Sequence, residues 1–208
     1  NVSSNTNLTQ LDCSFNQLTS LDVTMLVNLT VLICDENQLT TLDLQNSSNL
    51  NQLECLNNLF TTIDLSNLVN LTILHIGNSN LNTVDFSSLV NLQDIAFGSG
   101  LQANLDFTNS PNISSFFLIN NSVIQNLDLS YLPNLNLITI DNNSQLEYLN
   151  LKTGSLINNP SSIISNNPNL KYVCVDEQNY DLILLNSSLN NVDFHINSYC
   201  SFVPGGNY

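Results

Sequence analysis

A repeat at a constant spacing of about 21 residues is the feature that most constrains how this chain can fold. An Asn-Leu pair opens each repeat, and its first five occurrences are evenly spaced, at Asn7, Asn28, Asn49, Asn70 and Asn91. Asn112 keeps the spacing, Asn134 comes one position late, and Asn169 follows only after an insertion. We count seven full repeats and one degenerate last repeat. A period of this length predicts a solenoid, in which each repeat forms one coil that stacks on the next.

The pattern within a repeat predicts the shape of one coil. Leu11 and Cys13 alternate with polar residues, which is the period of a short strand with one face in the core. A second alternation, at residues 21–23, indicates another extended stretch on the opposite wall. The residues between the two stretches must turn the chain back, which leaves no room for a long helix. We therefore expect a mostly β solenoid with a parallel sheet whose strands lie about 4.8 Å apart.

This pattern resembles the leucine-rich repeat family, whose hallmark L-x-x-L-x-L-x-x-N-x-L matches residues 8–18 with Cys13 in the third Leu position. The resemblance covers nearly the whole chain. The stretches "NQLTSLDV" and "NQLTTLDL" and the ending "CSFVPGGNY" are similar to bacterial proteins of the internalin-like type, particularly exported proteins of Bacteroidetes. The resemblance implies a right-handed solenoid with a parallel sheet on its concave face, extended or turn segments on its convex face, and few or no long helices.

The domain organisation follows from the repeat. We expect the solenoid to span residues 1–168, with repeat starts near 7, 28, 49, 70, 91, 112 and 134. Residues 169–208 are expected to form the degenerate last repeat and a C-terminal cap. In the similar exported proteins a secretion-sorting domain often follows the repeats, and none is visible before Tyr208, so we expect a fragment of a longer protein.

The charge of the chain argues against several classes of partner. Against 17 acidic residues the chain has only Lys152 and Lys171 as basic residues, and the net charge of -15 would repel phosphate backbones and anionic membranes. No apolar run is long enough for a transmembrane segment. We therefore expect neither nucleic-acid binding nor membrane insertion. Because Asn, Ser and Thr carry most of the polar surface, the composition is typical of a secreted or cell-surface protein.

Residues at equivalent positions of successive repeats form columns, and two of these columns have structural explanations. An asparagine carboxamide both donates and accepts, so it can satisfy backbone groups of neighbouring coils at a turn. That column has departures at Ser79 and Gly100 and otherwise comprises Asn16, Asn37, Asn58, Asn121 and Asn143. Cys13, Cys34 and Cys55 occupy a Leu-equivalent inward position, and we interpret them as small apolar core residues. A metal site is the alternative, but zinc would need a fourth ligand and deprotonated thiolates on an aliphatic face.

Two further cysteines, Cys174 and Cys200, lie outside that column in the segment that must cover the last open coil. A disulfide between them would close a loop of about 26 residues and stabilise the fold by roughly 3 kcal/mol. Such a bond fits an oxidising compartment, whereas two unpaired thiols are the alternative.

A column of aspartates recurs on the opposite wall. It comprises Asp22, Asp43, Asp64, Asp85, Asp106 and Asp128, and it ends at Asn150. A Ser or Thr often follows two positions later, which indicates a carboxylate that accepts backbone N–H groups at a turn. The alternative is a ladder of calcium sites, because hard cations bind stacked carboxylate oxygens. We expect turn capping and no cofactor, since each coil offers one carboxylate and no glycine-rich calcium loop.

The outward positions of the main strands vary from repeat to repeat, so the fold does not dictate them. Several are apolar, which either marks an interaction site or reflects the preference of a flat sheet for β-branched and aromatic residues. The binding residues predicted on this concave face are Val31, Ile33, Asp35, Glu54, Leu56, Ile73, His75, Phe117, Ile119, Leu137, Thr139 and Asp141.

Catalysis has little support in the sequence. His75 and His195 are the only histidines, no Gly-x-Ser-x-Gly or Cys-His arrangement occurs, and the carboxylates form repeat columns instead of a converging pair. We predict a non-catalytic binding module of a secreted or cell-surface bacterial protein, which presents its concave face to a protein or polysaccharide in adhesion or capture. The alternative is a structural spacer or stalk within a longer exported protein.

Overall fold

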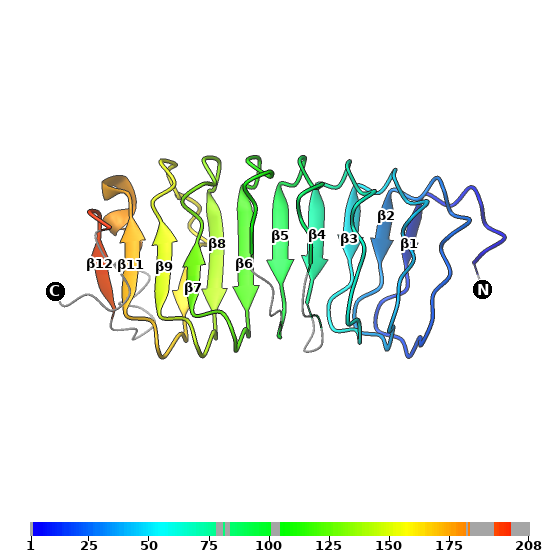
Figure 1. Ribbon diagram of the computed structural model, residues 1–208, viewed down its shortest axis with the longest axis horizontal. Helices are drawn as coiled ribbons and strands as arrows, with labels where there is room; N and C mark the ends of the chain where they lie inside the picture. Colours follow the sequence, from blue (N-terminus) through cyan, green and yellow to red (C-terminus); the bar gives the residue numbers. More distant parts are fainter. Residues whose placement is uncertain are drawn as a thin grey trace.

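The computed structural model describes residues 2–77, 81, 84–100, 105–181, 183 and 194–200. Within these residues the chain forms one long stack of coils, with the first and last described residues at opposite ends of the stack (Figure 1). Most of the strands belong to an eight-stranded parallel sheet in the order β1-β2-β3-β4-β5-β6-β8-β10. These strands are β1 (Gln10–Asp12), β2 (Val31–Ile33), β3 (Gln52–Glu54), β4 (Ile73–Ile76), β5 (Asp94–Phe97), β6 (Ser115–Ile119), β8 (Leu137–Asp141) and β10 (Ile163–Ser165).

The register of this sheet follows the repeat. Leu11 lies beside Leu32, Leu32 beside Leu53, and Leu53 beside Leu74, so equivalent residues of successive coils are neighbours. Along β6 the exposure alternates between buried and half-buried, as expected for a strand with one face in the core. Within the described residues, the prediction of a mostly β, parallel-stranded solenoid with few or no long helices is confirmed.

A second, four-stranded parallel sheet forms on the opposite wall near the C-terminus, in the order β12-β11-β9-β7. Its strands are β7 (Asn126–Asp128), β9 (Tyr148–Leu151), β11 (Tyr172–Val175) and β12 (His195–Asn197). In Figure 1 the arrows of β9 and β11 point opposite to those of β5 and β6, as the two walls of a coil require. In the first five repeats the described part of this wall is extended or turned without a ladder.

The last coils differ from the expected repeat register. The main-sheet strand β10 lies inside the segment that the sequence analysis treated as an insertion, and the motif that starts at Asn169 leads to β11 on the opposite wall. The reason is that Leu170, Val173 and Val175 reproduce the leucine spacing of the main strand but pack into the core from the other wall. The division into residues 1–168 and 169–208 stays a prediction.

The core is one continuous apolar cluster along the stack. Leu32, Leu53, Leu74 and Ile95, from four successive coils, are all fully buried. Where successive coils carry Phe in place of Leu, the rings contact one another, with a centroid separation of 4.9 Å between Phe86 and Phe107. None of the helical segments in the described chain is long and apolar enough to cross a membrane.

The predicted disulfide is present. Cys174 on β11 is bonded to Cys200, which lies 26 positions later in the sequence, with 5.3 Å between the two Cα atoms. This Cα separation lies in the usual range for a disulfide. The bond therefore ties the end of the described chain to the second sheet.

Candidate functional site

The asparagine column is a structural ladder, as predicted. The Nδ2 group of Asn37 donates to the carbonyl oxygens of Cys13, Cys34 and Asp35 at 3.0–3.1 Å. Its Oδ1 accepts the backbone N–H of Leu18 at 3.0 Å, so one carboxamide links two coils. Asn58 and Asn143 repeat this role, and Asn167 extends the ladder within the supposed insertion, whereas Ser79 lies outside the described residues.

A second asparagine ladder was not recognised from the sequence. At six of the repeat starts the opening asparagine donates through Nδ2 to a carbonyl oxygen of the preceding coil; the donors are Asn28, Asn49, Asn70, Asn91, Asn134 and Asn169. The signal was its recurrence at every repeat start. Both ladders explain recurring asparagines of the repeat through the stacking of coils.

The aspartate column caps turns, as predicted. The Oδ1 of each of the six aspartates accepts the backbone N–H two residues later at 2.9–3.1 Å. The Thr24 hydroxyl and backbone N–H hold the pKa of Asp22 below its ordinary value. Within the described ranges, no three His, Cys, Asp or Glu side chains are placed to share a metal ion. Calcium binding by this column stays an untested alternative.

The cysteine column packs in the core. Cys34 and Cys55 are completely buried, and Cys13 is half-buried in the first coil. Burial raises the pKa of the Cys34 and Cys55 thiols well above their ordinary value, so they remain neutral. Their environment is that of small core residues, as expected from the sequence.

The N-terminal end of the stack exposes part of its core. Leu11 and Leu18 are half-buried there, whereas the equivalent Leu32 and Leu39 of the next coil are fully buried. Leu11 and Leu18 line a hollow of about 510 Å³ together with Cys13.

The outward face of the eight-stranded sheet, which we call the sheet face, carries all twelve predicted binding residues. The register aligns them in columns, such as Ile33 beside Glu54, Glu54 beside His75, and Ile119 beside Asp141. Each of the twelve is half-buried. Their alignment is therefore as predicted, while their role in binding stays a prediction.

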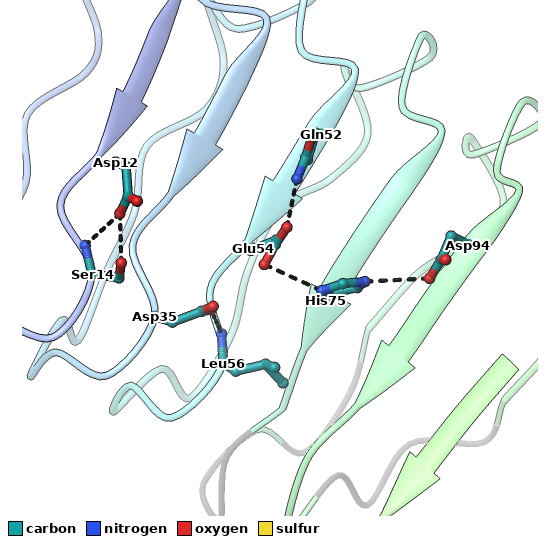
Figure 2. Close-up of polar contacts among 8 residues, drawn as sticks. All are labelled: Asp12, Ser14, Asp35, Gln52, Glu54, Leu56, His75 and Asp94. Atoms are coloured by element: carbon teal, nitrogen blue, oxygen red, sulfur yellow. Dashed lines mark hydrogen bonds and ion pairs between the residues drawn. The ribbon is translucent and has the colours of Figure 1, made fainter. Parts of the chain in front are cut away.

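A polar cluster occupies this face on three adjacent strands (Figure 2). The His75 ring on β4 lies between two carboxylates, with Nδ1 3.3 Å from Glu54 Oε2 on β3 and Nε2 3.3 Å from Asp94 Oδ1 on β5. Gln52 donates to Glu54 Oε1 at 2.5 Å. The binding residues predicted from the sequence include Glu54 and His75 but not Asp94 or Gln52.

The electrostatics of the cluster favour a protonated histidine. Burial lowers the pKa of His75, but the hydrogen bond to Asp94 and the charges of Glu54 and Asp94 outweigh it, and the net effect is a raised pKa. Asp35 on the neighbouring coil accepts the Leu56 backbone N–H at 2.6 Å. Burial nevertheless raises the pKa of Asp35, and the negative charge of Glu54 adds to this effect.

Two glycines let the coils approach closely beside the cluster. A Cβ atom on Gly77 would lie 2.5 Å from the backbone nitrogen of Gly98, and one on Gly98 would lie 3.1 Å from the Leu56 Cδ2 atom. No side chain can therefore be added at Gly77 without a shift of the backbone.

Neither a protein-family model nor a curated protein sequence matches the chain. Among solved structures, the functional domain of InlJ from Listeria monocytogenes is similar over 97% of this chain and 48% of that one, with 24% identity and a TM-score of 0.65. A leucine-rich repeat protein from Leptospira interrogans is similar over 93% of this chain and 62% of that one, with 17% identity and a TM-score of 0.55. The chain thus spans about half of the InlJ domain and less than two thirds of the Leptospira protein.

The InlJ domain is described as including a cysteine ladder. In the present chain Cys13, Cys34 and Cys55 take equivalent positions in three successive coils. The asparagine ladder, the stacked parallel strands and these structural similarities agree with one another. The chain therefore has a leucine-rich repeat fold of the internalin-like type.

Proposed function

We propose that the chain is a non-catalytic binding module of a secreted or cell-surface bacterial protein, and that its sheet face binds a protein in adhesion or capture. The observation that carries this proposal is the set of apolar side chains on the outward face of the main sheet. They are half-buried in the isolated chain: Val31, Ile33, Leu56, Ile73, Phe117, Ile119 and Leu137.

The packing of the solenoid does not require these residues. The inward columns fill the core and the two asparagine ladders link the coils, so the fold is satisfied without apolar groups on the outward face. Apolar residues gathered on an exposed surface are typical of interaction sites. The chain has no Trp, which makes a protein a better match for this face than a polysaccharide.

The polar groups on the face support binding over catalysis. Both ring nitrogens of His75 are engaged by carboxylates, and Asp35 accepts a backbone amide. Export is supported by the Cys174–Cys200 bond, since disulfides persist mainly in oxidising compartments.

A structural spacer is the second candidate. The observation that favours it is the regular stack itself, in which the first and last described residues lie at opposite ends of an elongated body (Figure 1). Such a body would hold neighbouring segments of a longer chain apart without binding a partner through its sheet face.

Serine substitutions on the sheet face would separate these two functions. The purified chain is first screened on protein and glycan arrays, and the quadruple variant Ile33→Ser, Leu56→Ser, Phe117→Ser and Ile119→Ser is then tested on every target found. The matched control replaces four exposed apolar residues outside the face, by Met25→Ser, Val27→Ser, Val69→Ser and Val90→Ser.

If the chain is a binding module, the face variant should no longer bind the target and the control variant should still bind it. Circular dichroism checks that both variants fold. If neither array yields a target, or if both variants bind equally well, the spacer becomes the better account.

A further inference from the structure

The position of His75 between two carboxylates restricts its protonation state. Nδ1 faces Glu54 and Nε2 faces Asp94, each at 3.3 Å and from opposite sides of the ring (Figure 2). Only the imidazolium form has an N–H donor on both nitrogens. A neutral ring can donate to one carboxylate and must turn a lone pair toward the other, so deprotonation releases one of the two acids.

A third carboxylate, that of Asp35, lies one coil before Glu54. Asp35 follows the end of β2, is half-buried, and has its Oδ1 on the backbone N–H of Leu56. Burial raises the pKa of Asp35, as expected for a carboxylate whose charge is incompletely compensated. A cation placed beside Asp35 would stabilise the charged form.

No lysine or arginine of this chain can provide that cation. The sequence contains two basic side chains besides histidine, and both are engaged near the second sheet. Lys171 forms an ion pair with Glu147 at 2.8 Å, and Lys152 donates to the carbonyl oxygen of Ser198 at 2.7 Å. Among the described residues, the sheet face therefore combines carboxylates with apolar side chains and has His75 as its one internal cation.

Apolar side chains beside the carboxylates would strengthen their attraction to a partner's cation. Ile33 lies beside Glu54 in the next coil, and Ile73 lies beside Asp94. Both are half-buried, and a docked partner would exclude water from them. Charge pairs that lose water interact more strongly than fully solvated pairs.

We propose that the protein partner places lysine or arginine side chains against Asp35, Glu54 and Asp94, and that protonated His75 competes with these side chains for Glu54 and Asp94. This inference rests on the proposed function, because it specifies the chemistry of a partner at the same face. The charge of the face is complementary to such a partner, and the net charge of -15 would speed its approach.

The competition sets the direction of the pH dependence. The charged groups around His75 are Asp35 beyond β2, Glu54 on β3 and Asp94 on β5. When His75 is protonated it engages the latter two and the partner's cation must displace it. When His75 is neutral one carboxylate is free, so a cationic partner binds more tightly at alkaline than at mildly acidic pH.

A peptide probe tests the charge component. The affinity of a labelled peptide of alternating Arg and Leu is measured by fluorescence anisotropy at about 150 mM salt, where distant charges are screened. The face variant carries both Asp35→Asn and Glu54→Gln. The control variant carries both Asp64→Asn and Asp85→Asn, so the two variants have the same net charge. Asparagine can keep the turn caps of the control, as Asn150 does by accepting the Lys152 backbone N–H.

The face variant should weaken peptide binding about tenfold, and the control should change it less than about twofold. Equal losses in the two variants would show attraction by net charge alone and would overturn this inference. The proposed function would survive that result, because its own test depends on the apolar residues and on a partner found by array.

A second comparison tests the competition. The native chain should bind the peptide about two to five times more tightly near pH 8.5 than near pH 6, and His75→Gln should remove most of this difference. If His75→Gln keeps the native pH profile, or if the native chain binds more tightly at the lower pH, the assigned role of His75 is wrong. Circular dichroism at both pH values checks that the variant is folded.

Discussion

Glu54 on β3 and His75 on β4 face each other across neighbouring coils, with 3.3 Å between Oε2 and Nδ1. The opposite nitrogen of the ring makes an equivalent approach to Asp94 on β5. The His75 side chain thus links three coils on the outward face of the sheet, away from the apolar core. Its interactions affect the stability of the stack as well as the charge of its surface.

The stability of the chain should depend on pH through this histidine. The folded pKa of His75 is raised above its ordinary value of about 6.5, so its contribution is complete below that pH and is lost as the pH rises through the folded pKa. His75→Gln should lower the free energy of unfolding by about 0.5–1 kcal/mol near pH 6 and by less near pH 9. Urea denaturation at both pH values measures the difference, with His195→Gln as the control. A loss that does not vary with pH would contradict the assigned pairing.

The asparagine ladder predicts a large difference between two members of one column. Asn58 is buried, donates to the carbonyl oxygen of Cys34 at 2.9 Å and accepts the Leu39 backbone N–H at 3.0 Å. Asn58→Ala should lower the free energy of unfolding by about 3 kcal/mol, because several buried backbone groups lose their partner. Asn16→Ala, in the exposed first coil, should cost less than about 1 kcal/mol. Similar costs in the two variants would argue against the ladder as the main support of the turns.

The contact between Gly77 and Gly98 predicts a backbone effect. Gly77→Ala would place a Cβ atom 2.5 Å from the Gly98 nitrogen, so we expect a loss of about 3 kcal/mol. Gly154 is the matched control, since its φ of +76° is unfavourable for alanine but open space surrounds it. Gly154→Ala should cost about 1 kcal/mol. Thermal denaturation of both variants gives the comparison, and a larger loss at Gly154 would show that the coils can separate easily at Gly77.

Ser47 and Ser110 stand at a position that is leucine in other repeats. Replacing each with alanine should change the free energy of unfolding in opposite directions. Ser47 is buried and its hydroxyl has no hydrogen-bond partner among the described residues, whereas the Ser110 hydroxyl donates to the Leu89 carbonyl oxygen at 2.8 Å. Ser47→Ala should therefore raise the free energy of unfolding by about 1 kcal/mol, and Ser110→Ala should lower it by about 1 kcal/mol. Destabilisation by Ser47→Ala would indicate a buried partner for that hydroxyl.

Much of this architecture could be predicted because it repeats. A column that returns at a constant spacing stacks on itself, so the strands, the turn caps of Asp22 and its equivalents, and the ladder of Asn37 and Asn58 follow from spacing alone. The pairing of Cys174 with Cys200 followed from their position outside the repeated columns. The strands and the asparagine ladder depend on residues at equivalent positions in neighbouring coils, whereas each turn cap depends on the residue two positions later in the same coil.

The remaining features depend on relationships that a repeat does not encode. Asp94 reaches His75 diagonally from another column, so column-by-column alignment does not bring them together. The leucine spacing of Leu170, Val173 and Val175 is compatible with either wall, and only the packing of the last coils assigns β11 to the second sheet. The approach of Gly77 to Gly98 depends on the path of two neighbouring turns.

The central claim is that a partner binds the sheet face, and photo-crosslinking tests it most directly. A benzoylphenylalanine replaces Phe117 on β6 in one sample and the exposed Leu59, outside that face, in another. With the partner recovered from the protein array, we predict a crosslink from position 117 and none from position 59. A crosslink from position 59 alone, with the partner still bound and position 117 unreacted, would contradict the account.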